Sequence, residues 1–236
     1  MVHLFSMYDY TLNTPVMKLF LTAFAILLLS FLPIPTEEAY GIDVSHHNGK
    51  IDWKKVKKHY HPLFVYVKAT EGSTYVDPQY ENNITGASKA GFLVGSYHFF
   101  RMTSSAHSQF ENFRQTVDIK KQKCIPMVDV ERADSHSPKE VQDSLNVFIS
   151  LVKNHFGQAP MIYATNRSYN ELLGKDYNKY HLYIGRYGDS APVIPGKGTY
   201  TIWQYTEKGS LKGIPKPVDK ARFNKKYSIA NILLSK

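Results

Sequence analysis

Residues 124–131 read Cys124-Ile125-Pro126-Met127-Val128-Asp129-Val130-Glu131, an almost continuous apolar run that ends in two carboxylates. A run of this kind is typical of a parallel strand that is buried on both faces. Because side chains alternate along a strand, Asp129 and Glu131 are predicted to point to the same side. In barrels of parallel strands the carboxyl ends carry the active site, so these two acids are candidates for chemistry. A strand that runs out into a solvated loop would also account for them.

Strand-like and helix-like segments alternate on both sides of this run. Strands are expected over residues 40–45, 63–70, 92–100, 160–165, 182–186 and 200–206. Helices are expected over residues 53–59, 78–90, 104–121 and 166–173, and from the capping box that Ser137 and Glu140 form. Five strand–helix units followed by strands without helices predict a barrel that loses its helices toward the end. A doubly wound open sheet is the alternative, although no glycine-rich dinucleotide motif follows the first strand.

A mostly apolar run, residues 19–32, lies near the N-terminus and is followed by two prolines. It is short for a membrane span, which needs about 20 apolar residues, and it fits the core of a signal peptide. Residues 1–39 are therefore expected to be a signal peptide, with Met17 as an alternative start, and an uncleaved membrane anchor is the competing interpretation. The remainder, residues 40–236, is expected to form one domain that is secreted or held in the periplasm or cell envelope.

The charge and the cysteine content limit the class of protein. Residues 41–236 contain 28 Lys and Arg residues against 17 Asp and Glu residues, a net charge of +11. An exported basic protein is attracted to anionic polymers, although charge also serves plain solubility. The single cysteine, Cys124, excludes an intramolecular disulfide. Stability must therefore come from a core, for which about 195 residues suffice.

Acids and aromatic residues gather where the predicted strands end. They are Asp43, Lys68, Glu71, Tyr97, His98, Phe99, Asp129, Glu131, Tyr163, Trp203, Gln204 and Tyr205, with Asp219 shortly after the last predicted strand. Each one alone could be a core or turn residue, but their convergence predicts a cleft that holds a polar ring and performs acid–base chemistry. Hydrolysis of a glycosidic bond needs one protonated and one ionised carboxyl group. Neighbouring carboxylates provide both forms because they push their pKa values apart.

Two other patterns could indicate a metal site or a modification site. His46 and His47 are adjacent, so they should point to opposite faces and should not bind one metal ion. We expect neither a metal nor another cofactor. The triplets that begin at Asn83 and Asn166 match the acceptor pattern for N-glycosylation, which matters only in a eukaryotic secretory host.

Six segments in order resemble glycoside hydrolase family 25, the Chalaropsis-type muramidases. They are Gly41-Ile42-Asp43-Val44-Ser45, Val67-Lys68-Ala69-Thr70-Glu71-Gly72, Gly95-Ser96-Tyr97-His98-Phe99-Phe100, Met127-Val128-Asp129-Val130-Glu131, Ile162-Tyr163 and Ile202-Trp203-Gln204-Tyr205. The resemblance implies a flattened β/α barrel, similar to a TIM barrel, with about five regular units and three extra strands. It also implies hydrolysis of the β-1,4 bond between N-acetylmuramic acid and N-acetylglucosamine, with peptidoglycan strands as the partner of a monomeric enzyme.

The resemblance assigns roles to individual residues. Glu131 would be the general acid, and Asp129 would orient the acetamido group of the substrate or stabilise charge. Asp43 and Asp219 would complete the acidic cleft. The residues expected to contact substrate are Tyr97, Phe99, Tyr163, Trp203, Gln204, Lys68 and Glu71.

The chain departs from the family pattern at two places. Lys220-Ala221 follows Asp219 where an apolar residue and an asparagine are usual, which weakens the role of Asp219, and Asn48 replaces a common glutamine. Retaining, inverting and substrate-assisted mechanisms all stay open.

Two other functions would be compatible with parts of this sequence. A catalytically silent glycan-binding relative would use the same barrel, but it would have no need of the acid set. A nucleic-acid binder lacks a recognisable motif and leaves the acids unexplained, so we expect no nucleic-acid partner.

Overall fold

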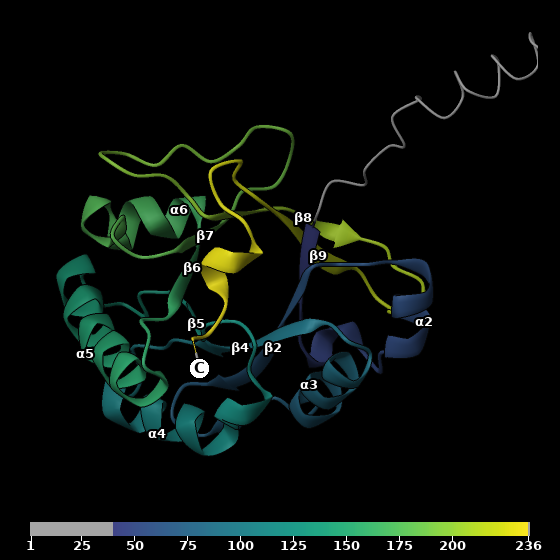
Figure 1. Ribbon diagram of the computed structural model, residues 1–236. Coiled ribbons are helices and arrows are strands. Elements are labelled where there is room, and N and C mark those ends of the chain that lie inside the picture. The colour runs from purple at the N-terminus through teal and green to yellow at the C-terminus, as the bar shows by residue number, and fades with distance from the viewer. Residues whose placement is uncertain (1–39, 236) are drawn as a thin grey trace, which may run out of the picture. The chain divides into compact units, whose positions relative to one another are not determined.

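The computed structural model describes residues 40–235 (Figure 1). The signal peptide or anchor expected over residues 1–39 lies outside the described residues. Within residues 40–235, no helix has the length and apolar character that crossing a membrane requires.

Eight strands close into a barrel. Seven of them run parallel: β1 (Tyr40–Val44), β2 (Phe64–Glu71), β4 (Leu93–Phe99), β5 (Met127–Asp129), β6 (Met161–Thr165), β7 (Leu182–Gly185) and β8 (Ile202–Gly209). The eighth, β9 (Val218–Phe223), is antiparallel to both of its neighbours, β8 and β1. Because β1 pairs with β2 as well as with β9, the sheet has no free edge here, which excludes the open-sheet alternative. A short strand, β3 (Tyr75–Val76), extends the end of β2 outside the barrel.

Helices follow the first strands and are missing after the last ones. They are α2 (Trp53–His59), α3 (Tyr80–Lys89), α4 (Ala106–Thr116), α5 (Pro138–Phe156) and the short α6 (Asn166–Ser168), which continues into a π-helical turn over Tyr169–Leu173. Short 3₁₀ turns cover His46–Asn48, Ile119–Lys121, Lys175–Tyr177 and Ile229–Ile232. No helix stands between β7 and β9, as the sequence pattern predicts. The capping box is also confirmed, because Ser137 N donates to Glu140 Oε2 over 2.8 Å at the start of α5.

The central stretch is paired differently from the prediction. Only Met127–Asp129 joins the barrel, between β4 and β6. Ile125 N donates instead to Ile232 O over 2.8 Å, and Cys124 forms an antiparallel bridge with Leu233. The C-terminal segment therefore pairs with the first half of the expected strand. The periodicity of the sequence cannot reveal such a long-range pairing. The expected helix over residues 104–121 likewise ends at Thr116, and a separate 3₁₀ turn begins at Ile119.

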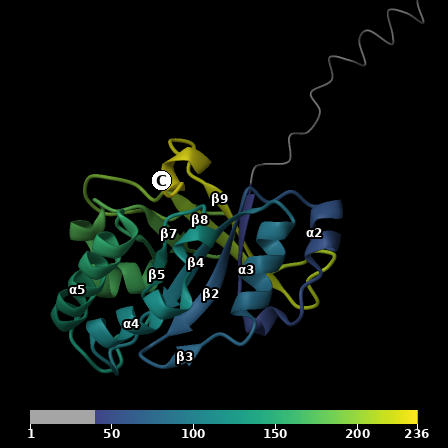
Figure 2. The ribbon, with the colours of Figure 1, turned by 60° about the horizontal axis from the view of Figure 1, so that its bottom comes forward.

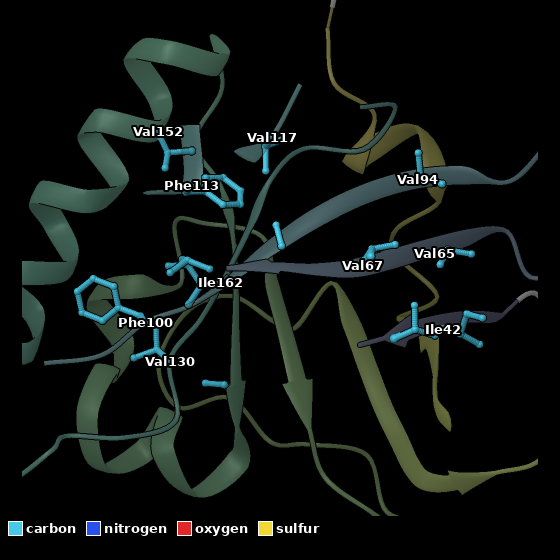
Figure 3. Packing of buried hydrophobic residues seen from close by; sticks show 14 of the residues in the cluster. Ile42, Val65, Val67, Val94, Phe100, Phe113, Val117, Val130, Val152 and Ile162 are labelled. Atoms are coloured by element: carbon cyan, nitrogen blue, oxygen red, sulfur yellow. The ribbon is translucent and has the colours of Figure 1, made fainter. Parts of the chain in front are cut away.

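Alternation along the strands divides the core into two layers. Side chains that point outward, among them Val65, Val67 and Val94, pack under the helices (Figure 3). Side chains that point inward, such as Phe64 and Tyr66 of β2, fill the barrel. The next inward position on β2 is Lys68, so the interior changes from apolar to polar toward the carboxyl ends of the strands. A polar cavity is therefore built at that end.

Candidate active site

A cavity of about 440 Å³ opens at the carboxyl ends of the strands. Its walls include nine of the eleven residues that the sequence singles out: Asp43, Lys68, Tyr97, Phe99, Asp129, Glu131, Tyr163, Gln204 and Asp219. The sheet register explains this convergence, because Asp43 of β1 lies opposite Asp219 of β9 and Asp129 of β5 lies beside Tyr163 of β6. Four carboxyl groups from three parts of the barrel therefore share one space.

Asp43 and Asp219 are hydrogen-bonded to each other through their side chains. Asp43 Oδ2 also accepts from the Tyr183 hydroxyl over 2.7 Å and from Gln204 Nε2 over 3.1 Å. Burial raises the pKa of Asp43, and these hydrogen bonds oppose the rise. Burial and the charge of Asp43 raise the pKa of Asp219 to about 9. The pair consequently holds a proton at neutral pH.

Asp129 is a buried acid of the cavity whose hydrogen bonding is incomplete. The residue is only 8% exposed, and its Oδ1 has no hydrogen-bond partner among residues 40–235. Burial raises its pKa well above the ordinary value, and the charges of Glu131 and Asp43 add to the rise, whereas Lys68 lowers it. A buried carboxyl oxygen without a partner is costly, so this atom is free to bind a polar group of a ligand.

Glu131 lies two residues beyond Asp129 and lines the same cavity. Burial raises its pKa, while a hydrogen bond with Tyr163 and the charge of Arg132 lower it. Tyr163 is itself held in place, because its hydroxyl donates to Gln204 Oε1 over 2.8 Å. A carboxyl group with a raised pKa in a partly buried cavity is what general-acid catalysis requires.

A chain of ion pairs runs from the cavity to the loop behind Glu131. Lys68 Nζ lies 2.7 Å from Glu71 Oε2, and Glu71 Oε1 lies 2.9 Å from Arg101 Nη1. Arg101 also donates to both carboxyl oxygens of Asp134 over 2.9 Å. Glu71 does not line the cavity, because its carboxylate is held between these two cations, and its contact with substrate stays a prediction.

Removing the Arg101 guanidinium should loosen the loop that follows Glu131. Asp134 and Ser135 hold left-handed φ angles of 45° and 71°, which non-glycine residues adopt at a cost. We expect Arg101→Met to destabilise the fold by about 1–3 kcal/mol and to lower kcat, because an unpaired Asp134 no longer fixes this loop. Arg101→Lys keeps the charge without the bidentate geometry and should restore only part of both losses.

Thermal melting and steady-state kinetics check this expectation. Arg114→Met is the matched control, because Arg114 forms a more exposed pair with Glu111 on α4. Such exposed pairs contribute little to stability, so this control should melt near the wild type. Equal melting temperatures and equal kcat for Arg101→Met would contradict the positioning role.

Trp203 does not line the cavity either. It precedes Gln204 on β8, and adjacent strand residues point to opposite faces, so only Gln204 reaches the barrel interior. Trp203 is 3% exposed, its Nε1 donates to Arg186 O over 2.6 Å, and the Arg222 guanidinium lies 4.4 Å from its ring. Its contact with a sugar stays a prediction, since the ring does not line the cavity in this conformation.

The cavity contains residues that the sequence did not single out as site residues: Ser45, His47, Asn48, Met127, Tyr187, Glu207, Lys216 and Pro217. Glu207 adds a fifth carboxylate. Irregular pairing of β8 with β9 on both sides of Thr206 shifts the alternation and brings Glu207 to the cavity. His46 turns away to bond Asp77 Oδ2 over 2.7 Å. Among residues 40–235, no cluster of three His, Cys, Asp or Glu side chains is placed to bind a metal ion.

Residues 42–214 match the family described as Glycosyl hydrolases family 25. Lysozyme M1 from Streptomyces globisporus is 33% identical over 207 residues, which cover 81% of this chain and 70% of that protein. The uncharacterized protein YegX from Escherichia coli K12 is 33% identical over 189 residues, which cover 78% of this chain and 69% of that protein.

Solved structures show the same barrel. The bacterial lysozyme from Streptomyces coelicolor superposes with a TM-score of 0.75 at 30% identity, covering 84% of this chain and 96% of that one. A family 25 glycosyl hydrolase from Bacillus anthracis gives 0.74 at 32% identity, covering 82% and 93%. With the family matched over most of the domain and the acids gathered in one cavity, this chain belongs to glycosyl hydrolase family 25, the family of these lysozymes, and is a glycoside hydrolase.

Proposed function

We propose that this protein is an exported muramidase that cleaves the β-1,4 bond between N-acetylmuramic acid and N-acetylglucosamine in peptidoglycan. One observation carries the proposal: Glu131, with its raised pKa, shares a cavity with the buried carboxyl of Asp129, whose Oδ1 has no hydrogen-bond partner among residues 40–235. Glycosidases need such a pair of carboxyl groups around the scissile bond. The names of the relatives, Lysozyme M1 among them, support the choice of substrate.

In the proposed mechanism Glu131 enters the reaction protonated. It gives its proton to the leaving glycosidic oxygen, a step that retaining, inverting and substrate-assisted routes have in common. Asp129 binds the acetamido group or stabilises the positive charge that develops on the sugar. Tyr97 and Phe99 supply ring faces for the sugar, while the pair of Asp43 and Asp219 keeps the far wall polar.

The products of peptidoglycan digestion test the activity. Purified protein is incubated with peptidoglycan, and the new reducing ends are identified by mass spectrometry. We expect N-acetylmuramic acid at every new reducing end. N-acetylglucosamine at the reducing end would identify a different bond, and intact glycan strands would favour the silent glycan-binding relative.

Export needs its own test, because it depends on residues 1–39. We propose that the exported protein is a soluble monomer that begins between Pro35 and Gly41. N-terminal sequencing of protein recovered outside the cytoplasm, with sedimentation of the same sample, checks both statements. Recovery of residues 17–35 in a membrane fraction would favour the uncleaved anchor instead.

A further inference from the structure

A second hollow lies outside the barrel and is lined by residues of α2, of α3 and of the segment before α2. Figure 2 shows the two helices, with α3 the nearer of them to β2. The hollow has a volume of about 480 Å³, and it shares no lining residue with the active-site cavity. Trp53 of α2 and Asn83 of α3 form part of its wall. The indole of Trp53 packs against the backbone of Gly86, where an added Cβ would lie 2.3 Å from Trp53 Cδ1. A glycine at that position lets the two helices approach closely enough to form the hollow.

Two buried donors of this hollow lack partners. Trp53 Nε1 and Asn83 Nδ2 make no hydrogen bond within residues 40–235, although the two residues are only 6% and 2% exposed. An unsatisfied buried donor costs about 1–3 kcal/mol, so two of them at one hollow call for an explanation. Both groups can only donate through these nitrogens, so the group that would satisfy them is an acceptor. The burial of Asn83 also removes it as a glycosylation acceptor in the folded domain.

The rim of the hollow is basic. Lys50, Lys54 and Lys89 line it and are exposed, and no carboxylate lies within ion-pair distance of them in the part of the chain that the structure describes. The only acid in the lining, Asp52, accepts from Lys55 N over 3.0 Å and caps α2. Three lysine ammonium groups near two unpaired N–H donors favour the binding of an oxyanion.

We infer that this hollow binds a phosphate ester of a small polyol or sugar. The phosphate oxygens accept from Trp53 Nε1 and Asn83 Nδ2 and neutralise the lysines, while the Trp53 ring and Ile51 cover the carbon skeleton. Both nitrogens are covered from solvent, and Trp53 Nε1 lies against Gly86 of α3, so binding requires this contact between the two helices to open. Binding here does not depend on the proposed muramidase activity.

The two tryptophans of the chain allow a direct test. The full-length protein is labelled with ¹⁵N and titrated with glycerol 3-phosphate, with glycerol and inorganic phosphate in parallel. We expect the indole N–H resonance of Trp53 to shift saturably. The Trp203 resonance should stay in place, since its indole already donates to Arg186 O over 2.6 Å. The ester should bind several-fold more tightly than inorganic phosphate, and glycerol alone should have no effect.

Charge-removing variants complete the test. Lys54→Gln combined with Lys89→Gln should lower the affinity for glycerol 3-phosphate at least tenfold. The matched control, Lys139→Gln combined with Lys153→Gln, removes the same charge from exposed positions on α5 and should leave the affinity unchanged. An unmoved Trp53 resonance, an equal effect of glycerol, or equal weakening by both double variants would overturn the phosphate site. Equal affinity for inorganic phosphate would overturn the ester.

Discussion

Glu131→Gln is expected to lower the turnover of peptidoglycan by about 10²- to 10⁴-fold while leaving the fold and glycan binding nearly intact. The amide has the shape and most of the hydrogen-bonding capacity of the acid, but it cannot deliver a proton to the leaving oxygen. Burial raises the pKa of Glu131, which favours the protonated form that a general acid needs. Turnover is measured by the release of reducing ends, binding by pelleting with insoluble peptidoglycan, and folding by thermal melting.

Asp129→Asn is the companion variant and separates the two roles. We expect it to be damaging as well, through lost positioning and charge stabilisation rather than through lost proton transfer. The pH profile should tell them apart, because only the loss of the general acid removes the limb that reports its ionisation. If Glu131→Gln keeps near-normal turnover while Asp129→Asn does not, the two roles must be exchanged. If both variants stay active, the catalytic assignment of this strand end is wrong.

Asp219→Asn is expected to stabilise the folded protein at neutral and alkaline pH. Burial and the neighbouring Asp43 raise the folded-state pKa of Asp219 to about 9, whereas an unfolded aspartate titrates near about 3.9. Between these values the folded protein holds a proton that the unfolded chain has released. The stability that the protonated Asp219 contributes to the fold is therefore complete below the unfolded-state pKa. It is lost as the pH rises through the folded-state pKa. The introduced amide does not titrate, and its N–H group can donate to the Asp43 carboxylate.

Melting curves from pH 4 to pH 9 check this expectation. The wild type should lose stability across the range, and the variant should lose less. At pH 8 we expect a gain of about 1–3 kcal/mol, after allowance for the solvent in the cavity, or roughly 3–10 °C in Tm. The two proteins should melt together near pH 4. Activity should fall, as is common when a strained site is relieved. The exposed Asp176→Asn serves as control, and equal pH dependence of all three proteins would contradict the shared proton.

Local patterns in the sequence were sufficient to predict most of the barrel. The apolar runs mark the strands, the capping box marks the start of α5, and the strand ends carry the acids. These features depend on periodicity and on nearby hydrogen bonds, which a sequence displays directly. The same alternation shows that Asp129 and Glu131 share a side and that Trp203 and Gln204 cannot. It does not say which of the last two faces the interior.

The tertiary structure alone decided the remaining features of the site. The C-terminal segment shortens β5 to Met127–Asp129, and β9 closes the barrel although its charged sequence does not read as a strand. Irregular pairing along β8 brings Glu207 to the cavity. The Glu71 carboxylate forms ion pairs with Lys68 and Arg101 and does not line the cavity. These outcomes depend on register, on bulges and on partners far apart in the chain. They are settled when the strands pack together, because only then do backbone hydrogen bonds and buried charges find their partners.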